Sequence, residues 1–171
     1  MSLLSNLHVD NFGPPRARVE IFEQHCHVPD FLGSLIAFSA SPELERQATW
    51  LIKRYLEKDM VTTPQESSAI IALLGTVTAW ESHLHLLQSI RHLTIPEASQ
   101  EKCLASLRSL ILHRRNFVRA WAFDALHTLA EQSEACRTEA LQAFSLAHDD
   151  SAASVQARIR NIVKANQMSS V

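Results

Sequence analysis

The feature that most constrains this fold is a helical apolar pattern that returns at a fixed interval. Between positions 116 and 131 the apolar residues at helical spacing are Val118, Trp121, Ala122, Ala125, Leu126 and Leu129. At about 100° per residue these side chains form one stripe, whereas Arg119, Asp124 and His127 lie off it. No proline or glycine interrupts the run, and Asn116 is a suitable N-cap. The pattern predicts a helix with one buried face.

Related patterns begin at Leu44, Val118 and Val155. Val118 lies 74 residues after Leu44, and Val155 lies 37 residues after Val118, so 74 residues correspond to two periods of 37. We expect the hidden repeat near Glu81, where the pattern fits only loosely. Helix pairs of this length bury their apolar faces only by stacking on neighbours. We therefore predict an all-α fold, an α-solenoid of about four antiparallel helix pairs.

Proline-containing segments mark the start of one expected helix and the N-terminal end of the expected helical region. Ser41-Pro42-Glu43 predicts a helix start, because it offers an N-cap, a proline at the first helical position and an acid in the first turn. Gly13-Pro14-Pro15 cannot continue a helix, since proline has no N–H to donate. We expect an extended N-terminal arm over residues 1–16, a single helical-repeat domain over 17–167 and a C-terminal tail over 168–171.

Composition agrees with a helical domain and argues against several classes of function. Of the 171 residues, 46% are hydrophobic and 20% charged, and only three are glycine, which favours helix over sheet. The formal net charge of −2 gives no general attraction to nucleic acid or to an anionic membrane. We therefore expect no membrane partner, although a local basic patch could still exist.

The cysteines and the start of the chain bear on localisation. Cys26, Cys103 and Cys136 are odd in number and far apart, as expected for small buried hydrophobes in a reducing compartment. The first residues lack the basic and apolar regions of a signal peptide, and no stretch has the roughly 20 apolar residues of a membrane helix. We expect a cytoplasmic protein.

The pattern of the second helix in each expected pair also resembles a known repeat family. The segment from Phe117 to Leu126 is similar to the Val-Arg-x-x-Ala-x-x-Ala-Leu helix of HEAT repeats, and residues 150–163 are similar with Gln156 in place of the arginine. The resemblance covers roughly residues 30–167. It implies that the second helices line a concave surface and that the arginine often bonds an aspartate of the adjoining repeat. Arg119 and Asp150 would form that pair.

The residues that could bind a metal or catalyse a reaction are better explained by structural roles. His85 and His92 share a helical face, but about 10 Å separates them along the axis, too far for one metal ion. The His25-Cys26-His27 cluster has no second Cys/His cluster at suitable spacing. No nucleophile motif or phosphate-binding glycine loop is present. We expect no catalytic residue, metal or cofactor, and we expect Asp149-Asp150 to stabilise a helix start.

A basic cluster supports an alternative function. Arg108, His113, Arg114, Arg115 and Arg119 gather around one turn. DNA-alkylation-repair glycosylases are solenoids that grip DNA with a basic concave surface, tryptophans and a carboxylate, for which Trp121 and Asp124 would be candidates here. Against this, Trp121 lies on the apolar stripe, where a core role is simpler. Nucleic-acid binding or a glycosylase-like activity therefore stays an alternative.

The favoured hypothesis is a non-enzymatic scaffold that binds a protein or peptide on its concave face. The repeat period and the lack of catalytic motifs favour it. The candidate binding residues are polar residues off the core stripe: Arg46, Lys53, Arg54, Arg119, Asp124 and His127.

Overall fold

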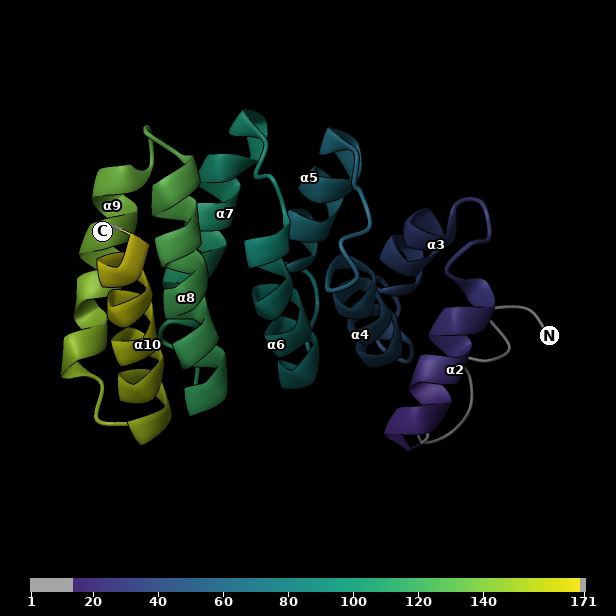
Figure 1. Cartoon of the computed structure of the whole chain (residues 1–171), viewed down its shortest axis with the longest axis horizontal. Coiled ribbons are helices and arrows are strands. Elements are labelled where there is room, and N and C mark those ends of the chain that lie inside the picture. The colour runs from purple at the N-terminus through teal and green to yellow at the C-terminus, as the bar shows by residue number, and fades with distance from the viewer. Residues whose placement is uncertain (1–13, 170–171) are drawn as a thin grey trace. The chain divides into compact units, whose positions relative to one another are not determined.

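The computed structural model describes residues 14–169, and within this range the regular structure is helical, with no strand (Figure 1). The all-α expectation is confirmed for these residues. The α-helices are α2 (Pro15–His25), α3 (Phe31–Phe38), α4 (Glu45–Leu56), α5 (Pro64–Leu73), α6 (Trp80–Ser89), α7 (Glu97–Leu110), α8 (Asn116–Gln132), α9 (Arg137–Ser145) and α10 (Ala153–Ser169). Short 3₁₀ turns, η1 (Ile90–His92) and η2 (Leu146–Asp149), follow α6 and α9.

The chain divides into two compact units, one ending at Leu93 and the other beginning at Thr94. The first unit contains α2 to α6, and the second contains α7 to α10. Helix α2 begins at Pro15, inside the segment expected to be an extended arm, while the rest of that arm, residues 1–13, lies outside the described residues. Helix α10 extends to Ser169, into the expected tail, whose last two residues also lie outside the description. The single repeat domain over 17–167 stays a prediction.

In the first unit, α4 is the central helix. It packs against α2, α3 and α6, and α5 packs against α3 and α6. Leu51 and Ile52 of α4, Ile70 of α5 and Leu86 of α6 are fully buried between these helices. The start of α5 is fixed by a capping box, in which Thr63 and Glu66 satisfy each other's backbone N–H groups.

In the second unit, α8 is central and packs against α7, α9 and α10. Val118, Ala122, Leu126 and Leu129 are buried to 0% exposure and Ala125 to 1%, as expected for the stripe, whereas Trp121, which was expected in the core, is only half-buried. The expected cap is wrong in detail. Arg115 occupies the N-cap position, and Asn116 is the first helical residue, where its Oδ1 accepts the N–H of the next residue at 2.9 Å.

A buried carboxylate joins two helices of the first unit. Glu45 is 3% exposed, and it accepts the backbone N–H groups of Thr78 and Ala79 and the hydroxyl of Thr78. Ala79 is the N-cap of α6 and has no side-chain cap of its own. The carboxylate therefore satisfies N–H groups at the helix start and places negative charge at the positive end of the helix dipole.

Glu45→Gln is expected to lower the free energy of unfolding by about 1–2 kcal/mol, because the amide keeps one acceptor but loses the charge and turns its NH₂ group toward N–H donors. Urea denaturation followed by circular dichroism measures the change. Glu43→Gln, an exposed glutamate two residues earlier, is the matched control and should change stability by less than about 0.5 kcal/mol. Equal stability of the two variants would contradict the capping role.

A search of the described helices finds none that could cross a bilayer.

Candidate binding surfaces

The six residues expected to bind a partner fall on two helices in different units. Arg46, Lys53 and Arg54 belong to α4 of the first unit, and Arg119, Asp124 and His127 belong to α8 of the second. Each set is therefore described within its own unit. The expectation that all six share one concave face stays a prediction.

Two of the three α4 residues, Arg46 and Lys53, form ion pairs. Arg46 lies 3.8 Å from Glu81 of α6, and its side chain is 60% exposed. Lys53 pairs with Glu57 one turn along α4 at 2.9 Å. The pair of the exposed Arg46 contributes about 0–1 kcal/mol, so it leaves that cation available to a partner, whereas only 21% of the Lys53 side chain is exposed. The Nε atom of Arg54 is buried and has no hydrogen-bond partner among the described residues.

A half-buried histidine lies beside this set. The Thr49 hydroxyl donates to the Glu45 carbonyl at 2.7 Å and lies 3.1 Å from Nδ1 of His85, so it accepts the proton of that nitrogen. Burial, followed by the positive charges of Lys53 and Arg18, lowers the pKa of His85 to about 3. The imidazole is therefore neutral at physiological pH.

Arg119 of α8 binds Asp150, which belongs to the same unit. Arg119 donates to both carboxylate oxygens of Asp150, at 2.6 and 3.0 Å, and to the carbonyl of His113 at 3.0 Å. The ion pair expected from the sequence is thus confirmed. The Arg119 hydrogen bond holds the pKa of Asp150 below its usual range, and Asp150 also accepts the Ala152 N–H at the start of α10. This pair fastens α8 to the segment that begins α10.

Asp124, expected on a polar surface, is buried. Its side chain is 4% exposed and lies 3.6 Å from the guanidinium of Arg158 on α10. That guanidinium also lies 3.6 Å above the ring of Trp121, one turn before Asp124 on α8. His127 similarly packs against Phe144, with 5.7 Å between ring centroids. These side chains hold α9 and α10 against α8 and offer little open surface.

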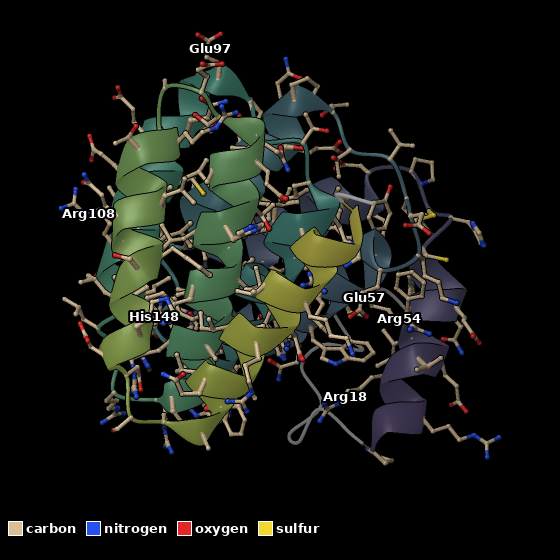
Figure 2. The ribbon with its side chains drawn as sticks, turned by 60° about the vertical axis from the view of Figure 1, so that its left-hand side comes forward. Arg18, Arg54, Glu57, Glu97, Arg108 and His148 are labelled. Atoms are coloured by element: carbon tan, nitrogen blue, oxygen red, sulfur yellow. The ribbon has the colours of Figure 1, made fainter. Side chains whose placement is uncertain are left out.

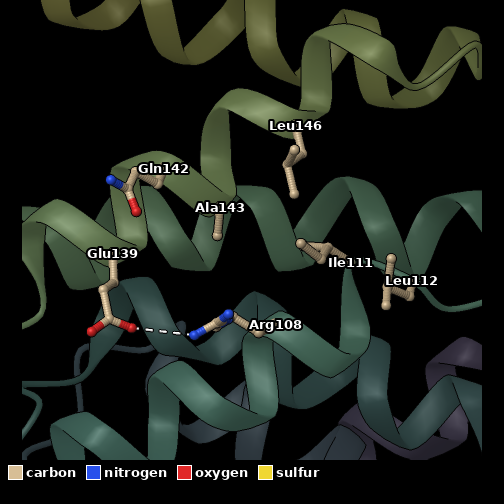
Figure 3. A pocket seen from close by; sticks show the side chains of 7 residues that line it. All are labelled: Arg108, Ile111, Leu112, Glu139, Gln142, Ala143 and Leu146. Carbon is tan, nitrogen blue, oxygen red and sulfur yellow. Dashed lines mark hydrogen bonds and ion pairs between the residues drawn. The ribbon is translucent and has the colours of Figure 1, made fainter.

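The described residues also contain a groove that sequence reasoning missed. It lies between α7 and α9, has a volume of about 640 Å³ and is shown in Figure 3. Its apolar walls are formed by Ile111, Leu112, Ala143 and Leu146. The side chains of Arg108 and Glu139 form an ion pair of 3.2 Å across it. We call this surface the α7–α9 groove.

A second, smaller hollow of about 270 Å³ adjoins the groove, and the Arg108–Glu139 ion pair lies where the two meet. Arg108 and Glu139 line both hollows, and Leu104, Ala105 and Cys136 add apolar surface to the smaller one. Helices α7 and α9 both pack on α8, and the two hollows lie between them. The groove therefore continues along α7 beyond the ion pair.

The remaining candidate chemistry is limited within the described part of the chain. No three His, Cys, Asp or Glu side chains gather there as a set of metal ligands. The three cysteines are free thiols, and Cys103 is fully buried. Burial, followed by the neighbouring Cys136, raises the pKa of Cys103 to about 12, so this thiol is not a nucleophile at neutral pH.

Comparison of the chain with protein-family models, with curated proteins and with solved structures finds no match. The likeness to HEAT repeats therefore depends on the residues of the chain itself.

Proposed function

We propose that this chain is a HEAT-like α-solenoid that binds a protein or peptide partner as a non-enzymatic scaffold. The proposal depends on contacts that join the second helix of one pair to the second helix of the next pair, or to the residues just before it. They join residues about one repeat apart: Glu45 to Thr78 across 33 positions, Thr49 to His85 across 36, and Arg119 to Asp150 across 31. Stacked helix pairs with this period are the units from which binding solenoids are built.

The packing within each unit supports the same proposal. The helices that come second in each pair pack side by side, α4 on α6 and α8 on α10, and the first helices α3 and α5 also pack together. Repeats of this kind present one helix from each pair to a common face, which gives an extended surface suited to a polypeptide. Arg46 is the cation of the proposed face with the longest ion-pair distance, 3.8 Å, and Lys53 lies about two turns further along the same helix.

The test is capture of partners by the full chain, with chemical cross-linking to map where each partner binds. We expect at least one protein to be retained specifically, and Arg46→Glu with Lys53→Glu to reduce its retention about tenfold, an effect of about 1.4 kcal/mol. Lys58→Glu changes the same charge at an exposed residue just beyond α4 and serves as the matched control. If no protein is retained above the level of an unrelated helical protein, the proposal fails.

Nucleic-acid binding is the alternative, and the exposed arginines Arg114 and Arg115 favour it. Against a glycosylase-like reaction, Trp121 stacks on Arg158, and that arginine also pairs with the buried Asp124. Titration of labelled duplex DNA at increasing salt separates the two functions, because phosphate contacts make the affinity fall steeply with salt. DNA binding at low salt that is lost on Arg114→Glu with Arg115→Glu would favour the alternative.

A further inference from the structure

We draw no further inference here: the strongest candidate, the basic cluster that Arg18, Lys53 and Arg54 form beside Trp50 in the first unit (Figure 2), carries nothing, because Lys53 pairs with Glu57 at 2.9 Å, Arg18 lies over the Trp50 ring, the Nε atom of Arg54 is buried, and nothing in the structure shows which anion would bind there.

Discussion

Arg158→Ala is expected to lower the free energy of unfolding by about 3–5 kcal/mol, because it leaves a buried carboxylate without its cation. Asp124 is 4% exposed, and the guanidinium that offsets its charge lies 3.6 Å away. The same substitution removes the cation stacked 3.6 Å above the Trp121 ring. That contact contributes a further ~0.5–2 kcal/mol where solvent is partly excluded.

Urea denaturation at pH 7 measures this loss, and a double-mutant cycle assigns it to the pair. Asp124→Asn removes the charge while preserving the shape, so Arg158→Ala in that background should be less costly by about 1–3 kcal/mol. Arg160→Ala is the control on the same helix, since Arg160 is exposed. Additive effects of the two substitutions would show that Arg158 stabilises the chain through packing alone.

The helices of this chain are largely predictable from its sequence, because one side of each must be apolar. Apart from the half-buried Trp121, the stripe from Val118 to Leu129 is buried as expected, and the repeat positions Leu44 and Val155 are 5% and 0% exposed. The Arg119–Asp150 ion pair was expected from the resemblance to HEAT repeats, and the two residues do pair. Periodicity therefore predicts the elements, whereas this contact was predicted from the resemblance.

Helix starts are less predictable, because several residues can satisfy the same N–H groups. Ser41-Pro42-Glu43 suggested the start of α4, but the helix begins at Glu45, after a turn. The side chain of Glu45 then accepts the N–H groups of Thr78 and Ala79, which are distant in sequence. A local pattern cannot identify a cap that is supplied by another helix.

The candidate surfaces were the least predictable part. Asp124 lies off the apolar stripe, yet α10 covers it, because Arg158 supplies a compensating charge from 34 residues later in the sequence. The α7–α9 groove was missed because it depends on how far apart two helices lie on α8, and sequence spacing does not specify that distance. The only local signal was Leu112, an apolar residue directly before the basic turn.

Acid is expected to destabilise the first unit through His85. The imidazole takes up a proton in the unfolded chain near pH 6.5, whereas burial, with Lys53 and Arg18 nearby, keeps its pKa in the folded chain at about 3. Between these values the unfolded state binds more protons, so stability falls as the pH falls. The slope is about 1.4 kcal/mol per pH unit, which gives a loss of about 3 kcal/mol at pH 4.

Comparison with His85→Gln isolates this contribution, because the amide can still donate to Thr49 and does not titrate. Urea denaturation of both proteins from pH 7 to pH 4 should show the stability of the wild-type chain falling by about 3 kcal/mol relative to the variant. Other groups titrate in both proteins and cancel in the difference. His92→Gln, which makes the same change at an exposed position in η1, is the matched control. A constant difference for His85→Gln would mean that the imidazole can become charged in the folded chain, because water reaches it there.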